Sequence, residues 1–146
     1  MKTLDVLSKV RLVAIAMFAV LGISMSVHAQ DSENNISKTN ALGEISPSKA
    51  LNYMKSTKGL VIVDVATARE YKEKHFEGAI NIHYTEMEKR YNEIPKNSIV
   101  LLHCRLGMVV PKAYKILLEK RPDLKEISYI NGAPLFDEYN KWIKNK

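Results

Sequence analysis

The hydrophobic positions of the chain form continuous runs and helical stripes that alternate along its length. Leu60 to Val65 and Ser98 to His103 are largely apolar runs, a pattern typical of strands covered on both faces in a parallel sheet. Val110 to Lys120 carries apolar residues at helical spacing and ends before Arg121-Pro122, which predicts an amphipathic helix. Ile127 to Ile130 predicts a further strand.

Capping and turn residues predict the shorter elements. They are a helix after Ser46-Pro47, a helix over Ala68 to Lys74 behind a capping box at Thr67 and Glu70, a short strand over Ile80 to Ile82, a helix with the same cap spacing at Thr85 and Glu88 that ends before Pro95, and a last helix from Pro134. Because strands and helices alternate, the sequence predicts a single α/β domain with a largely parallel central sheet flanked by helices.

The beginning of the chain has the pattern of an export signal. A basic start leads into the apolar run Leu12 to Ile23 and then into small residues up to Ala29, so we expect a signal peptide over residues 1–29, cleaved after Ala29. The apolar run is shorter than the roughly 20 residues that a membrane-spanning helix needs. Residues 30–44 are polar and without periodicity, and we expect a flexible leader there. The sequence thus predicts a periplasmic or secreted protein, without stable membrane insertion after cleavage, whose folded domain occupies residues 45–146.

Charge and cysteine content narrow the classes of function. The formal net charge is +6, but the lysines are scattered, which favours a solvated basic surface over a nucleic-acid groove. Cys104 is the only cysteine, so it cannot form a disulfide within the chain. It is either buried and inert, paired with another molecule, or kept for chemistry. With no second cysteine and no paired histidine spacing, the sequence predicts no metal site.

The position of Cys104 favours chemistry. It follows the Ser98 to His103 strand, at the edge where open α/β sheets bind ligands, and a helix begins a few residues later. The amides of residues 105–109, with Gly107 to allow the turn, can form a nest of N–H donors at the helix N-terminus, and such a nest stabilises an anion such as a thiolate. Arg105 adds a positive charge next to the thiol unless it faces solvent.

Two stretches resemble the rhodanese family. In VDVATAREYKEKHFEGAINI an aspartate ends a strand, and the family's E-Y and G-A-x-N-I motifs follow it. CRLGMV resembles the rhodanese active-site loop. The matching positions are Asp64, Glu70, Tyr71, His75, Gly78, Ala79, Asn81, Ile82, Cys104, Arg105 and Gly107. The resemblance runs from about Ile45 to Trp142, and the size and export signal suggest the single-domain, periplasmic members of the family.

The resemblance implies a thiosulfate sulfurtransferase. In this family the cysteine, here Cys104, takes a sulfane sulfur from a donor such as thiosulfate and passes it, as a persulfide, to cyanide or a thiol. A protein thiol is a further candidate acceptor, and no cofactor is needed. The loop residues expected to bind the substrate and the persulfide are Arg105, Leu106, Gly107, Met108 and Val109. Asp64 either contacts this loop from the neighbouring strand end or caps the helix that follows it, and Arg69, close by in the sequence, is a further candidate to support the loop from behind.

Departures from the family pattern leave a second function open. Ala66 stands where many members have an arginine, Lys74 replaces a glycine, and Val109 and Val110 replace hydroxyl or arginine side chains at the end of the loop. The alternative is therefore a catalytically weak rhodanese-like binding or sulfur-carrier module. His103-Cys104 also fits the start of a phosphatase loop, but Val110 occupies the position of the arginine that would grip phosphate.

Overall fold

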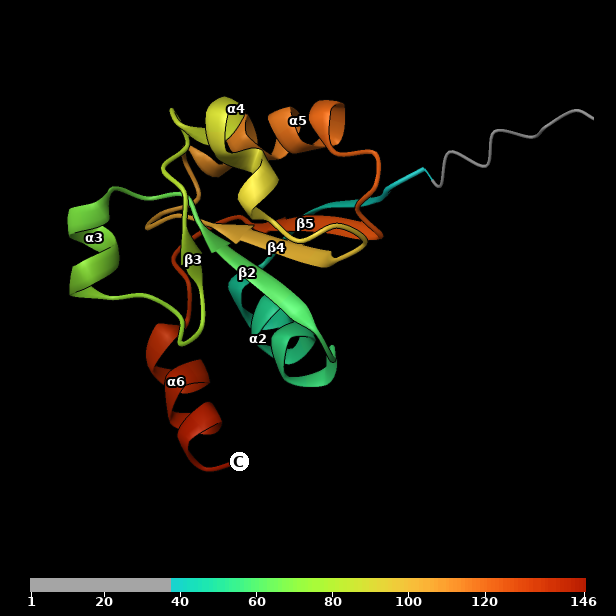
Figure 1. Cartoon of the computed structure of the whole chain (residues 1–146). Helices are drawn as coiled ribbons and strands as arrows, with labels where there is room; N and C mark the ends of the chain where they lie inside the picture. Colours follow the sequence, from blue (N-terminus) through green and yellow to red (C-terminus); the bar gives the residue numbers. More distant parts are fainter. Residues whose placement is uncertain (1–37) are drawn as a thin grey trace, which may run out of the picture. The chain divides into compact units, whose positions relative to one another are not determined.

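The computed structural model describes residues 38–146, which form a five-stranded parallel sheet flanked by helices (Figure 1). The strand order is β1-β5-β4-β2-β3. The strands are β1 (Asn40–Ile45), β2 (Leu60–Asp64), β3 (Ile80–Asn81), β4 (Ile99–His103) and β5 (Glu126–Ile130). The helices are α2 (Pro47–Ser56), α3 (Ala68–Glu73), α4 (Met87–Arg90) with the 3-10 turn η1 (Tyr91–Glu93), α5 (Val110–Lys120) and α6 (Phe136–Lys144). The predicted α/β class and parallel sheet are confirmed.

The two faces of the sheet carry separate hydrophobic clusters. Helices α4 and α5 lie on one face, and α2 and α6 lie on the other (Figure 1). Because side chains alternate along a strand, β4 contributes to both clusters. Leu102 packs under α5, whereas Leu101 packs toward α6. Cys104 belongs to the first cluster, while the His103 ring lies 5.5 Å from that of Phe136 on the opposite face.

The folded chain begins earlier than the sequence predicted. We expected a flexible leader over residues 30–44, but Asn40–Ile45 forms strand β1, which pairs in parallel with β5. It is an edge strand that pairs on one side only, with most of its side chains exposed or half-buried. Hydrophobic periodicity therefore gives almost no signal there. The predicted signal peptide over residues 1–29 lies outside the described residues.

The predicted helix caps were confirmed for α2 and α3 but not for α4. The Ser46 cap, Pro47 at the first helical position and the Thr67/Glu70 capping box are all present. The prediction at Thr85 was wrong, because α4 has no side-chain cap and the Thr85 hydroxyl pairs instead with Nδ1 of His83 at 2.7 Å. Helix α4 is accordingly a single turn.

The sheet order brings three connections to one edge. Strand β2 lies between β4 and β3, and Asp64 at the end of β2 is in register with His103 at the end of β4. Beyond the strands, the Val65 amide still donates to His103 O at 2.8 Å, and the Tyr84 amide donates to Val65 O at 3.1 Å. The segments that follow β2, β3 and β4 therefore meet around Cys104. No helix within residues 38–146 is long and apolar enough to cross a membrane.

Candidate active site

The thiol of Cys104 lies at the start of a tight loop between β4 and α5. Its side chain is buried, with 4% of its surface exposed. The backbone N–H of Gly107 points back at the sulfur and donates to Sγ at 3.2 Å. One backbone donor of the loop therefore faces the position that an anion would occupy, without any charged side chain. A thiolate or a persulfide at Cys104 would be stabilised by this loop.

Gly107 is required by the shape of this loop. Its φ is +81°, in the left-handed region that side chains disfavour. A Cβ at this position would also collide with the backbone of Asn131 and Gly132, in the connection between β5 and α6. The loop therefore rests directly on another segment of backbone, and this contact fixes the amide that faces the sulfur.

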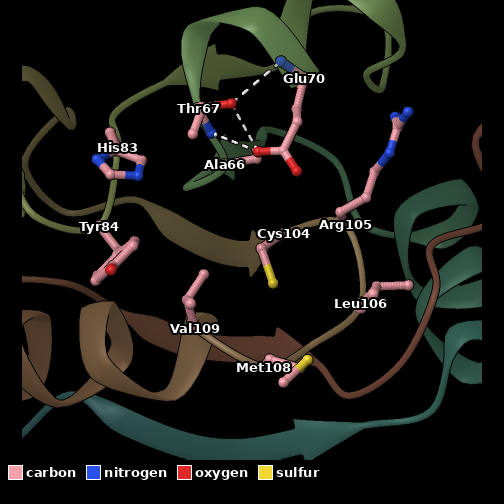
Figure 2. A pocket seen from close by; sticks show the side chains of 10 residues that line it. All are labelled: Ala66, Thr67, Glu70, His83, Tyr84, Cys104, Arg105, Leu106, Met108 and Val109. Atoms are coloured by element: carbon pink, nitrogen blue, oxygen red, sulfur yellow. Dashed lines mark hydrogen bonds between the residues drawn. The ribbon is translucent and has the colours of Figure 1, made fainter.

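A pocket of about 320 Å³ opens in front of the thiol (Figure 2). Its wall is supplied by the connections after β2, β3 and β4. The lining residues are Ala66, Thr67, Glu70, His83, Tyr84, Cys104, Arg105, Leu106, Met108 and Val109. A donor that enters this pocket would meet Sγ of Cys104 with the Gly107 amide behind it.

Arg105 lines the pocket, but its guanidinium group is engaged elsewhere. Nη2 lies 3.3 Å from Oε2 of Glu73, and Nη1 donates to Lys74 O at 3.4 Å. Figure 2 shows the side chain running away from the sulfur of Cys104. Its charge is therefore largely compensated by Glu73, and it does not reach toward a substrate in this conformation.

A buried acid and a buried histidine lie behind the loop. Asp64 is 2% exposed and His103 is fully buried, and Oδ1 of Asp64 lies 3.9 Å from Nδ1 of His103. Burial raises the pKa of Asp64 to about 6, although the Ala66 amide, which donates to Oδ1 at 2.9 Å, opposes this. Burial also lowers the pKa of His103 to about 3. The folded protein thus favours the neutral form of both groups.

Residues 46–142 match the Rhodanese-like domain family. The chain belongs to the rhodanese-like family.

The individual relatives of this rhodanese-like domain agree with that assignment. Over 102 residues it is 31% identical to the "Putative sulfur carrier protein YrkF" of Bacillus subtilis. That match covers 70% of the chain but 53% of the relative, so the chain spans about half the length of that protein. Together, the family and this relative support a function related to sulfur transfer.

Solved structures show the same fold. A rhodanese-like domain protein from Staphylococcus aureus superposes with a TM-score of 0.54 at 22% identity, over 63% of the chain and 87% of that structure. A rhodanese-related protein from Thermoplasma volcanium gives 0.53 at 18% identity, over 70% of the chain and 91% of that structure.

The structure brings together some of the predicted site residues of this rhodanese-like domain and separates others. The pocket is lined by five residues of the loop, namely Cys104, Arg105, Leu106, Met108 and Val109. Gly107 is not a lining residue, but its amide donates to the sulfur. Asp64 does not line the pocket but supports the end of β2 through Ala66. Arg69 was expected behind the loop, but its side chain is exposed and faces Glu73 at 3.9 Å.

Sequence reasoning missed four lining residues. Thr67 was interpreted only as a helix cap, and Glu70 as part of that cap and as a position of the family motif. No site role was predicted for His83 or Tyr84. All four follow the carboxyl ends of β2 and β3, and such positions in a parallel sheet predict a ligand-binding edge. Among residues 38–146 no three histidine, cysteine or acidic side chains are grouped so that they could hold a metal ion.

Proposed function

We propose that this rhodanese-like domain is a sulfurtransferase that works through a persulfide on Cys104. The Cys104 thiolate attacks the outer sulfur of a sulfane donor such as thiosulfate, and a new S–S bond forms. The rest of the donor, sulfite in the case of thiosulfate, leaves with the electron pair of the old bond. Cyanide or a thiol then attacks the outer sulfur of the persulfide and restores the thiolate. The sulfane sulfur moves without an external oxidant or reductant.

The observation that carries this proposal is the Gly107 amide aimed at Sγ of Cys104 at 3.2 Å, at the base of an open pocket. Preorganised backbone donors of this kind stabilise the developing anion without reorganisation. The loop needs no cofactor to do so. Leu106, Met108 and Val109 shape the pocket around the reacting sulfur.

The test is sulfur loading and release by the purified protein. Incubation with thiosulfate should add the mass of one sulfur atom to the intact chain, and cyanide should remove it as thiocyanate. Cys104→Ser should abolish both signals. Because Cys104 is buried in an apolar cluster, we expect that variant to lose about 1 kcal/mol of stability and still to fold. Absence of both mass gain and thiocyanate with wild type, over several donors, would rule out the sulfurtransferase.

A sulfur carrier is the second candidate. It is favoured by the similarity to the putative sulfur carrier protein of Bacillus subtilis. The apolar Val109 at the end of the loop also favours it, because this side chain offers no donor to a sulfonate. A carrier would load Cys104 once and release sulfur slowly to small acceptors, with a protein thiol as the preferred acceptor. Multiple turnovers with cyanide would favour the enzyme, whereas a single loading event without turnover would favour the carrier.

We also propose that the protein acts outside the cytoplasm, in the periplasm or as a secreted protein. This rests on the signal-like pattern of residues 1–29. N-terminal sequencing of protein from a periplasmic extract should begin at Gln30. Recovery of chains beginning at Met1 from the cytosol alone would contradict it.

A further inference from the structure

The mouth of the pocket is more apolar than a site for an inorganic anion requires. Among residues 38–146, the large hydrophobic side chains that stand exposed are Leu42, Leu106 and Met108. Leu106 is 61% exposed and Met108 is 78% exposed, and these two flank Gly107 at the rim (Figure 2). Val109 and Tyr84 continue the apolar wall inward. Exposed apolar side chains gathered at one cavity indicate contact with an apolar group.

The charged groups around the pocket also disfavour an inorganic dianion. Glu70 lines it, and the Thr67 hydroxyl and amide, at 2.7 and 3.0 Å from Oε2, hold the pKa of this carboxyl below its usual range. Glu70 is therefore negative, while the Arg105 charge is compensated by Glu73. Lys112 lies 5.5 Å from the centre of the Tyr84 ring and is not among the lining residues. Arg105, the arginine that lines the pocket, is paired with Glu73, so a dianion such as thiosulfate would meet little net positive charge there.

We propose that the donor for this site is an organic sulfane compound with an apolar substituent and at most one negative charge, rather than inorganic thiosulfate. This rests on the proposed sulfurtransfer at Cys104. For a thiosulfonate, the Cys104 thiolate attacks the terminal sulfur, the bond from that sulfur to the sulfonyl group breaks, and the sulfinate leaves with the electron pair. The substituent lies against Leu106, Met108 and Tyr84 while its terminal sulfur faces Sγ.

The direct test compares three donors on the wild-type protein: benzenethiosulfonate, methanethiosulfonate and thiosulfate. Each kcat/KM is divided by the rate constant of the same donor with a small free thiol, which removes differences in intrinsic reactivity. We expect the aromatic donor to exceed the methyl donor by about tenfold, because an added apolar group in an apolar pocket contributes on this scale, and thiosulfate to be the poorest. Equal values for the two thiosulfonates, or a preference for thiosulfate, would overturn the inference while the sulfurtransferase would stand. Failure of all three donors to load Cys104 would instead contradict the proposed function.

Matched variants assign the preference to the rim. Leu106→Ser should lower the ratio of the aromatic to the methyl donor about threefold, because part of the apolar contact is removed. Leu42→Ser makes the same change at an exposed leucine of β1 outside the pocket and should leave the ratio as it is. The inference is wrong if the two variants give the same ratio.

A second variant tests the charge. Glu70→Gln keeps the capping box, because glutamine serves at this position as glutamate does, and removes the negative charge. It should raise kcat/KM for the thiosulfate dianion several-fold more than for either monoanion. An equal effect on all three donors would show that Glu70 does not discriminate by charge.

Discussion

Val109 stands beside Cys104 in the pocket, where its side chain is half-buried and precedes the first residue of α5 (Figure 2). Valine has nearly the same shape as threonine but has no hydroxyl group to donate a hydrogen bond. A hydroxyl at this position would line the pocket and could donate to the sulfonate end of a bound thiosulfate. With valine at this position, only backbone groups of the loop can donate hydrogen bonds to the sulfonate end, and we therefore expect weak binding of thiosulfate.

Val109→Thr should lower the KM for thiosulfate by about tenfold, because a hydrogen bond to a charged acceptor contributes roughly 1.5–3 kcal/mol. Val109→Arg should act in the same direction through its charge. The measurement is thiocyanate formation against thiosulfate concentration. Val110→Thr is the control, since Val110 is fully buried in the apolar cluster and outside the pocket lining. It should cost stability without lowering KM, and an equal decrease in both variants would refute the role given to Val109.

At the level of the elements, the ends of β2 and β4 each carry a buried titratable residue, and the two residues have opposite effects on how stability depends on pH. Asp64 and His103 are cross-strand neighbours in register, and burial favours the neutral state of each. Relative to the ordinary pKa values of 3.8 and 6.5, that of Asp64 is raised to about 6 and that of His103 is lowered to about 3. Between about pH 4 and 6, the folded Asp64 holds a proton that the unfolded chain lacks, while the folded His103 lacks one that the unfolded chain holds. The two contributions to the pH dependence of stability therefore oppose each other.

Removing either partner should reveal the contribution of the other. Asp64→Asn removes the Asp64 contribution and leaves that of His103 unopposed, so the free energy of unfolding should decrease relative to wild type as the pH falls from about 6 to 4. His103→Phe removes the His103 contribution and leaves that of Asp64 unopposed, so the free energy of unfolding should increase relative to wild type as the pH falls below about 6.5. Each slope has an upper limit of about 1.4 kcal/mol per pH unit. Urea unfolding at several pH values measures both, and parallel curves for both variants and wild type would contradict the balance.

The same elements show which parts of the fold the sequence predicts. Leu60 to Val65 and Ser98 to His103 were predicted correctly because strands buried on both faces must be apolar throughout. Asn40–Ile45 was missed because an edge strand buries little, and its partner β5 lies more than eighty residues away in the chain. The loop around Cys104 was predicted because its residues are contiguous. Tyr84 and Glu70 line the pocket because of the order of the strands in the sheet, and no local sequence pattern predicts that order.

At the scale of the molecule, the active-site loop depends on segments distant in sequence. Gly107 rests on Asn131 and Gly132, and the Asn131 amide in turn donates to Ile45 O, at the end of β1, at 2.9 Å. Support for the reacting sulfur thus passes from the N-terminal strand through the β5 connection to the loop. The edge strand missed from the sequence is part of this support.

Gly107→Ala should displace the active-site loop from its contact with the connection between β5 and α6. The added methyl group combines a left-handed backbone with a collision against Gly132, so we expect a loss of about 2–4 kcal/mol in stability and of most sulfur loading at Cys104. Gly59→Ala is the matched control, because Gly59 also has a positive φ, of +71°, but nothing lies within 4 Å of its Cβ position. It should cost about 1 kcal/mol and leave loading intact. Thermal unfolding and intact mass distinguish the two, and equal losses would show that the contact with Gly132 is unimportant.

Because the single thiol is buried, the molecules that can reach the reacting sulfur differ between the protein without bound sulfur and the protein that carries a persulfide. With 4% of Cys104 exposed at the base of the pocket, a bulky thiol is hindered from approaching Sγ itself. A sulfur atom carried on Cys104 would extend about 2 Å beyond Sγ, into the opening. Large thiols could then collect the outer sulfur, although they cannot reach Sγ of the persulfide to form a mixed disulfide and expel hydrosulfide. Depth alone would thus let the protein deliver sulfur to acceptors that are too large to trap it.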